Sequence, residues 1–157
     1  MNTMKRSKEI VSILVLILLD RFTKYLIETH MLLGQEIVLI PGFFSLTYVR
    51  NTGAGFSLLE GQRVFFIVIT IAALALFGVL WYRCREEDRW EKVSYILILA
   101  GTIGNFIDRV ATGSVVDFLD FLIFGYDFPV FNVADICLTV GAGLFLLLSL
   151  RGGEKHA

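Results

Sequence analysis

Charged side chains are scarce in this sequence. Asp, Glu, Lys and Arg together make up 18% of the 157 residues, whereas apolar residues make up 56%. A soluble domain of this length is ordinarily less apolar and more charged. The composition therefore predicts a single integral membrane domain covering residues 1–157. The formal net charge of −1 argues against nucleic acid as a partner, because phosphate contacts need clustered Lys and Arg.

Cysteine and histidine are also rare, with two residues of each. Cys84 borders an apolar run and Cys137 lies inside one, so we expect two free packing residues and no disulfide. His30 and His156 are far apart, and no Cys/His cluster has metal-ligand spacing. The sequence also lacks G-x-S-x-G and H-E-x-x-H. We therefore expect no metal, no cofactor, and neither a serine hydrolase nor a zinc protease centre.

Four segments are apolar and long enough to cross a bilayer as helices, which takes about 20 residues. They cover about residues 10–33, 64–82, 93–109 and 133–150. Residues 4–19, MKRSKEIVSILVLILL, lead into the first span and look like a signal peptide, but no small-residue cleavage site follows and the helical pattern continues. The sequence therefore predicts a retained first span and a membrane protein with an all-α core of four transmembrane helices.

Basic residues in the short loops predict the orientation. Nine of them lie before the first span, between the second and third spans, or after the fourth: Lys5, Arg6, Lys8, Arg83, Arg85, Arg89, Lys92, Arg151 and Lys155. The opposite loops carry only Arg50 and Arg63. We therefore expect both termini in the cytoplasm and the two longer loops outside.

The two outward loops have different patterns. EIVLI and FFSLTYV are short β-prone runs separated by Pro41-Gly42, a turn pair, and they predict a small extracytoplasmic β-hairpin. The second loop contains FLDFLIFGYDF, which mixes aromatic residues with acids. We expect this part to lie along the membrane interface as a loop or helix.

Ionisable residues inside an apolar span are costly to insert and by default suggest function. Asp20 and Lys24 are four residues apart, share a helix face and can form an ion pair, which favours a structural or supporting role. Asn105, Asp108 and Arg109 end the third span. They form either a polar helix end with a local ion pair or one wall of an active site, and for Asp108 we favour the first.

Small residues accompany these polar positions. Ala100, Gly101 and Gly104 form a strip on the third span that would let another helix approach closely. RNTGAGF, residues 50–56, contains two glycines and an asparagine, which favours a tight turn where the backbone comes close to another group.

Asp135 stands at the outer end of the fourth span, with Asn132 three residues before it and Thr139 four after. The helix dipole favours an acid there, so a capping role is one explanation. It does not explain the second acid upstream, in VVDF. Two carboxylates sharing a site cannot both ionise easily, so one can activate water while the other donates a proton to a carbonyl. Such a pair suits peptide hydrolysis without a metal or a covalent intermediate.

Two other classes remain open from the residues alone. Intramembrane acids also suit a small proton-coupled transporter, although these acids gather near the outward side and no internal repeat is evident. A structural membrane protein would use its acids only as caps and ion pairs.

Five blocks together resemble the lipoprotein signal peptidase family, also called signal peptidase II, over essentially the whole chain. They are DRFTK (20–24), RNTGAGF (50–56), GNFIDR (104–109), VVDF (115–118) and FNVAD (131–135). The resemblance implies a multi-pass aspartic endopeptidase of the bacterial cytoplasmic (inner) membrane whose active site faces outward. Its substrates would be diacylglyceryl-modified prolipoproteins, cut before the lipidated cysteine. Membrane lipids would surround it, and globomycin-type inhibitors would bind its pocket.

The same resemblance implies that Asp117 and Asp135 are the catalytic pair. It implies substrate-binding or supporting roles for Asn51, Asn105, Arg109, Asn132, Asp20 and Lys24. Two positions depart from the family's usual residues: Arg21 replaces glutamine and Phe128 replaces tryptophan.

The aromatic segment at residues 118–128 lies between the two expected catalytic acids. We expect it to act as a flap over the site, because a lipidated substrate would enter laterally from the bilayer. Asp120 and Asp127 would keep this segment at the water boundary.

Overall fold

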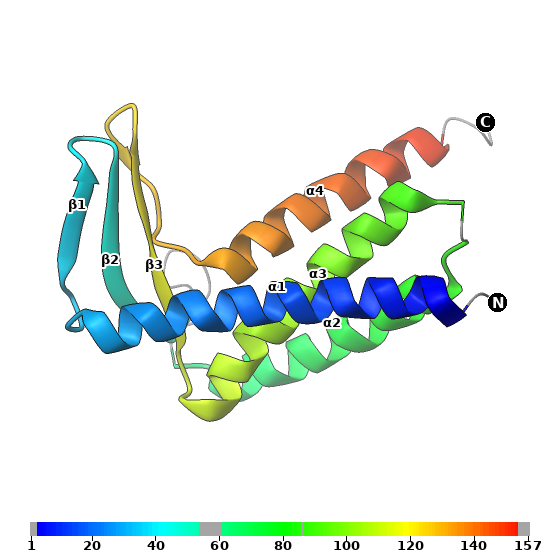
Figure 1. Cartoon of the computed structure of the whole chain (residues 1–157), viewed down its shortest axis with the longest axis horizontal. Coiled ribbons are helices and arrows are strands. Elements are labelled where there is room, and N and C mark those ends of the chain that lie inside the picture. Colours follow the sequence, from blue (N-terminus) through cyan, green and yellow to red (C-terminus); the bar gives the residue numbers. More distant parts are fainter. Residues whose placement is uncertain (1–2, 54–60, 86, 154–157) are drawn as a thin grey trace.

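The computed structural model describes residues 3–53, 61–85 and 87–153. Within these ranges the chain forms a helical bundle with a β-sheet at one end, and the start of the first helix and the end of the last helix lie toward the other end (Figure 1). The helices are α1 (Thr3–His30), α2 (Arg63–Arg83), α3 (Arg89–Ala111) and α4 (Val133–Gly153). The strands are β1 (Glu36–Ile40), β2 (Phe44–Asn51), β3 (Val115–Ile123) and β4 (Tyr126–Asp127).

Among the described residues, α2, α3 and α4 are long and apolar enough to cross a membrane. Only 11% of the apolar stretch of α2 and 17% of the apolar stretch of α4 is buried inside the protein, as expected for helices that face lipid. The corresponding share for α3 is 50%, because α3 packs against α1, α2 and α4. The helix α1 is similarly long but carries Asp20, Arg21 and Lys24 within its apolar stretch.

The first helix ends at His30, slightly before the predicted limit at Leu33. The chain turns at Gly34, whose φ of 81° suits glycine, and the Gly34 N–H donates to the Tyr48 carbonyl at 2.9 Å. This contact turns the chain from α1 directly into the sheet.

The sheet is antiparallel with strand order β1-β2-β3-β4. Its β1–β2 hairpin confirms that EIVLI and FFSLTYV pair as antiparallel strands. The prediction of an interfacial loop or helix for the second outward loop is wrong, because that segment forms β3 and β4. The run VVDFLDFLI is rich in β-branched and aromatic residues and pairs with β2, and the chain reverses at Phe124 and Gly125, both with positive φ.

One face of the sheet packs against the C-terminal end of α1. The buried cluster there consists of Ile27, Met31, Tyr48, Val116 and Phe118. Since side chains alternate along a strand, the residue between Val116 and Phe118 points away from this cluster. That residue is Asp117, so the core fixes its direction.

Helices α3 and α4 approach closely through the predicted small-residue strip. A Cβ at Gly101 would overlap the carbonyl oxygen of Ala134, and one at Gly104 would lie 2.7 Å from Oδ2 of Asp20. This packing brings Asn105 on α3 next to the first turn of α4.

Candidate active site

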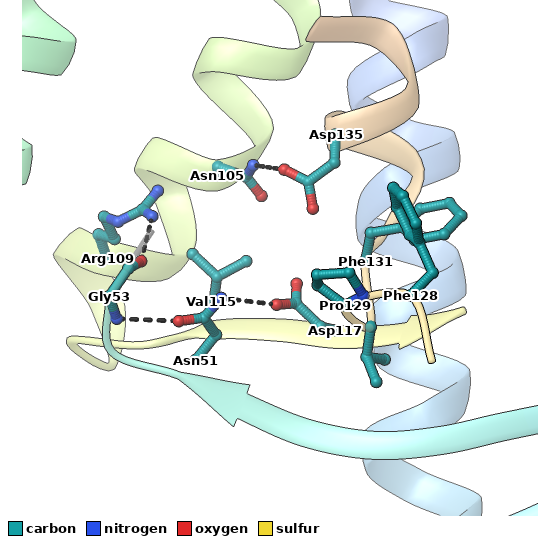
Figure 2. Close-up of a pocket in the computed structure, with 11 residues that line it drawn as sticks. Asn51, Gly53, Asn105, Arg109, Val115, Asp117, Phe128, Pro129, Phe131 and Asp135 are labelled. Atoms are coloured by element: carbon teal, nitrogen blue, oxygen red, sulfur yellow. Dashed lines mark hydrogen bonds between the residues drawn. The ribbon is translucent and has the colours of Figure 1, made fainter. Parts of the chain in front are cut away.

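Asp117 and Asp135 open into one pocket of about 220 Å³ at the junction of the sheet and the helices. Asp117 comes from β3 and Asp135 from the first turn of α4. Figure 2 shows the two carboxyl groups pointing into the same space from opposite sides. The structure thus brings together two acids from two different elements.

Asp117 is 2% exposed and is held by two side-chain amides. Asn51 Nδ2 donates to one carboxyl oxygen at 3.0 Å, and Asn132 Nδ2 donates to the other at 2.7 Å. Burial, reinforced by the charge of Asp135, raises the pKa of Asp117 to about 6 despite these two hydrogen bonds. Asp117 therefore retains its proton at a pH where an exposed aspartate has lost it.

Asp135 is both a helix-capping residue and a pocket residue. Its carboxylate accepts hydrogen bonds from Asn105 Nδ2 at 2.7 Å and from the backbone N–H of Asn132 at 3.2 Å. In return, its own N–H donates to Asn132 Oδ1 at 2.9 Å, a reciprocal arrangement like a capping box. The capping explanation is therefore correct, and it coexists with the position of this acid in the pocket.

Asn132 bonds to both acids. It is 0% exposed, and its amide nitrogen contacts Asp117 and also Asn105 Oδ1, at 3.2 Å. Its amide oxygen accepts the N–H of Asp135. One buried side chain thus sets the position of β3, α3 and α4 around the pocket.

Lys24 lies behind the pocket and is completely buried. Its ammonium is 2.8 Å from Asp20 Oδ2, 2.8 Å from Asp108 Oδ2 and 3.0 Å from Asn105 Oδ1. Two ion pairs and one hydrogen bond thus surround the ammonium. Because the ammonium occupies Asn105 Oδ1, the amide nitrogen of Asn105 faces Asp135. The ion pair predicted for Asp20 and Lys24 is present, and Asp20 Oδ1 also accepts the N–H of Ala134 at 2.9 Å.

Asp108 has a larger role than the sequence suggested. Its charged partners are Lys24 and Arg21 of α1 rather than a neighbour on its own helix. Its carboxylate also accepts the N–H of Val116 in β3, at 3.4 Å. Asp108 thus links α1, α3 and β3. Arg21 gave a hint, because a cation in place of a neutral residue inside a span needs an acidic partner.

Arg109 lines the pocket and holds the end of β2. Its guanidinium donates to the Gly53 carbonyl at 3.0 Å and lies 4.8 Å from the ring centre of Phe66. Gly53 in turn donates its N–H to Asn51 Oδ1 at 2.9 Å, which forms the predicted turn. Arg50, the first residue of the RNTGAGF block, forms an ion pair with Glu28 at 2.7 Å. Residues 54–56 of the block lie outside the described residues.

Five of the eight sequence-predicted site residues line the pocket: Asn51, Asn105, Arg109, Asp117 and Asp135. The other three, Asp20, Lys24 and Asn132, lie directly behind them. Of the pocket wall at residues 128–131, which joins β4 to α4, the sequence reasoning placed only Phe128 over the site, as the last residue of the expected flap. The position of residues 129–131 between the two acids was the available signal for the others. The rest of the expected flap, residues 118–127, forms most of β3, β4 and the turn between them, and Phe118 is buried in the core.

Both cysteines are free, as predicted. The sequence spacing did not reveal that the thiol of Cys84 and the carboxylates of Asp88 and Glu91 lie within 4.8 Å of one another, in the connection between α2 and α3. Burial, aided by the charges of Glu91 and Asp88, raises the pKa of Cys84 to about 11. A thiol that stays protonated is a poor metal ligand and a poor nucleophile.

Residues 12–151 match the family described as Signal peptidase (SPase) II. A lipoprotein signal peptidase of Symbiobacterium thermophilum is 51% identical over 140 residues, 88% of this chain and 91% of that protein. That of Halalkalibacterium halodurans is 46% identical over 144 residues, 90% and 91% of the two chains. That of Staphylococcus aureus is 43% identical over 135 residues, 86% and 83%.

Two solved structures are similar over nearly the whole chain. Both are described as bacterial membrane enzymes determined by the in meso method. One, at 2.3 Å resolution, has a TM-score of 0.89 and 39% identity, and covers 96% of this chain and 92% of its own. The other, at 1.9 Å, has a TM-score of 0.84 and 41% identity, and covers 92% and 94%.

Proposed function

The chain belongs to the signal peptidase II family, and from this membership we infer that it is a multi-pass membrane endopeptidase that removes signal peptides from bacterial prolipoproteins. We propose that Asp117 and Asp135 are its catalytic pair. The observation that carries this proposal is that two carboxyl groups from separate elements face one pocket, each oriented by a buried asparagine amide.

The pair divides the work of hydrolysis between an acid and a base. Asp135 lies at the N-terminus of α4, where the helix dipole and two donated hydrogen bonds favour the carboxylate. Asp117 keeps the shared proton, consistent with its pKa of about 6. The two groups titrate as one coupled unit.

The reaction proceeds through a tetrahedral diol. Asp135 takes a proton from water while the water oxygen bonds to the scissile carbonyl carbon, and Asp117 gives its proton to the carbonyl oxygen. In the collapse step, one hydroxyl of the diol returns a proton to Asp117. Asp135 gives its proton to the amide nitrogen as the C–N bond breaks. The products are the carboxyl end of the signal peptide and the free amine of the lipidated cysteine, and the pair is regenerated.

The remaining predicted residues position this pair. Asn51, Asn105 and Asn132 orient the carboxyl groups through the hydrogen bonds described above. Arg109 holds the β2 end against the pocket, and its charge favours an ionised acid nearby. The buried Asp20–Lys24 pair sets Asn105 and the first turn of α4.

We place the protein in the bacterial inner membrane with α1 as a fourth span. Internal neutralisation of Lys24 by Asp20 and Asp108 lowers the cost of carrying charge within that helix. The basic residues at the end opposite the sheet favour an orientation with both termini in the cytoplasm. The single domain then presents its sheet and its pocket at the outer surface, where lipids and globomycin-type inhibitors reach the site.

The test is cleavage of a purified prolipoprotein with and without its diacylglyceryl group. The proposal predicts one cut, immediately before the lipidated cysteine, located by mass spectrometry of both products. A transporter or a structural protein would leave the substrate intact, and a cut elsewhere would contradict the assignment.

A further inference from the structure

A groove continues from the active-site pocket along the face of the sheet. The next hollow, of about 410 Å³, shares Asn51, Asp117 and residues 128–130 with the pocket. A third hollow, of about 280 Å³, shares Asp120 and Asp127 with the second. We call these two outer hollows the sheet groove. Its outer hollow is lined by Glu36 and Val38 of β1 and by Gly42 in the β1–β2 turn. In Figure 1, β1 is the strand on the side of the sheet away from the helices.

An irregularity in the β2–β3 pairing puts Asp120 on this face. Asp117 and Asp120 are three residues apart, so simple alternation would place them on opposite faces. Their partners on β2, Val49 and Ser45, are four apart and share a face. The register shift between these pairs lets both aspartates face the groove.

The sheet groove is acidic. Beyond Asp117 it is lined by Glu36, Asp120 and Asp127, and no Lys or Arg is among the described residues that line it. Thr47 Oγ1 donates to Asp120 at 2.5 Å and Ser45 Oγ donates to Glu36 at 2.8 Å. These hydroxyl groups fix the carboxylates but leave their charge uncompensated.

Resting on the proposed function, we propose that the sheet groove binds the segment of the prolipoprotein that follows the lipidated cysteine. Glu36, Asp120 and Asp127 select for basic and neutral residues in that segment and against acidic ones. The signal peptide lies on the membrane side of the cut, so the chain after the cut must leave toward the outer end. The groove begins at the catalytic pair and runs in that direction, and its charge is complementary to a basic segment.

The experiment compares three lipidated prolipoproteins that differ only in the second to fifth residues after the cysteine, which carry lysines, glutamines or glutamates. The wild-type protein should cleave the lysine substrate with a kcat/KM about tenfold above that of the glutamate substrate at low salt, a ratio that falls as salt is added. The triple variant Glu36→Gln, Asp120→Asn, Asp127→Asn should bring the ratio close to one. The ratio is measured within each preparation, so differences in folded fraction cancel.

Glu28→Gln is the matched control, because Glu28 lies at the same end of the molecule but pairs with Arg50 outside the groove. It should keep the wild-type ratio. Equal cleavage of the lysine and glutamate substrates by the wild type, or a ratio unchanged in the triple variant, would overturn the inference. If the wild type cleaves none of the three substrates, the proposed function itself fails.

Discussion

At the scale of single residues, buried asparagines set the geometry of the pair. Asn132 caps α4, and its side chain forms hydrogen bonds with both the Asp117 carboxyl group and the Asp135 backbone N–H. Burying the Asn132 side chain removes a full amide group from water, which costs free energy. This free energy is recovered only if every donor and acceptor of the amide forms a hydrogen bond. Asn132 should therefore affect stability through its bond to the Asp135 N–H and catalysis through its bond to Asp117, and the two effects can be separated.

Substitution of Asn132 can separate these effects. Asn132→Ser keeps a side-chain oxygen for the N–H of Asp135 but cannot reach Asp117, so it should retain most of the stability and lose about 100-fold in kcat. Asn132→Ala should lose a similar factor in kcat and also about 1–3 kcal/mol of stability. Turnover of lipidated substrate and thermal unfolding in detergent measure the two effects. A serine variant with wild-type kcat would contradict the bridging role.

Asp117 should also make stability depend on pH. Its native pKa of about 6 lies above the unfolded value of 3.8, so the native state holds a proton that the unfolded state has lost between these values. Stability therefore falls as pH rises from about 4 to 6, on the order of 3 kcal/mol. Asp117→Asn should show a correspondingly smaller fall between pH 4 and 7 in denaturant unfolding. An unchanged fall would show that another group is responsible.

The sequence could identify the acids and their nearest polar partners but not all of the contacts between elements. Asp20 and Lys24 were predictable as a pair because both lie on one helix, where spacing fixes the geometry. The contact of Asp108 with Arg21 joins two helices, and its partner cannot be read from spacing along either one. The pocket wall at residues 129–131 was missed because its position at the pocket depends on a contact between elements, the bridge of Phe131 to Leu119 in β3.

At the scale of elements, the sheet and the α3–α4 contact position the acids. The hairpin β1–β2 was predictable because Pro41-Gly42 separates two β-prone runs. The strand β3 was not, because its aromatic residues and acids also fit an interfacial segment, and only pairing with β2 decides between them. Asp117 and the first residues of the expected flap therefore lie on a strand that is paired with β2.

The α3–α4 contact provides a test at this scale. Gly101→Ala places a Cβ against the Ala134 carbonyl, so α4 must shift, with an expected loss of about 1–3 kcal/mol and reduced activity. Gly143→Ala is the control, since a Cβ there meets nothing within 4 Å and alanine favours the helix. Thermal unfolding and turnover of both variants check this. Equal behaviour of the two variants would count against close packing as the positioning device.

At the scale of the whole molecule, the two ends of the bundle differ in chemistry. The pocket and the acidic sheet groove are lined by residues of the sheet. The connection between α2 and α3, which carries several basic residues, lies at the end away from the sheet (Figure 1). The sequence predicted this polarity, because the distribution of Lys and Arg requires no knowledge of the packing. Substrate selection would then occur outside the membrane and anchoring inside it.

Thiol labelling measures this orientation. In a background where Cys84 and Cys137 are replaced by alanine, Phe124→Cys at the exposed sheet tip should react with an impermeant maleimide in intact cells. Arg85→Cys, in the connection between α2 and α3, should react only after the membrane is permeabilised. The opposite pattern, or labelling of both sites in intact cells, would contradict the proposed topology.

The central claim, that Asp117 and Asp135 together perform the hydrolysis, is tested most directly by measuring cleavage of a lipidated prolipoprotein by Asp117→Asn and Asp135→Asn. Each variant should insert and fold yet lose at least about 1,000-fold in kcat, because neither an acid nor a base alone completes the proton transfers. Glu28→Gln should cleave like the wild type. Cleavage within tenfold of the wild-type rate by either asparagine variant would contradict the catalytic pair.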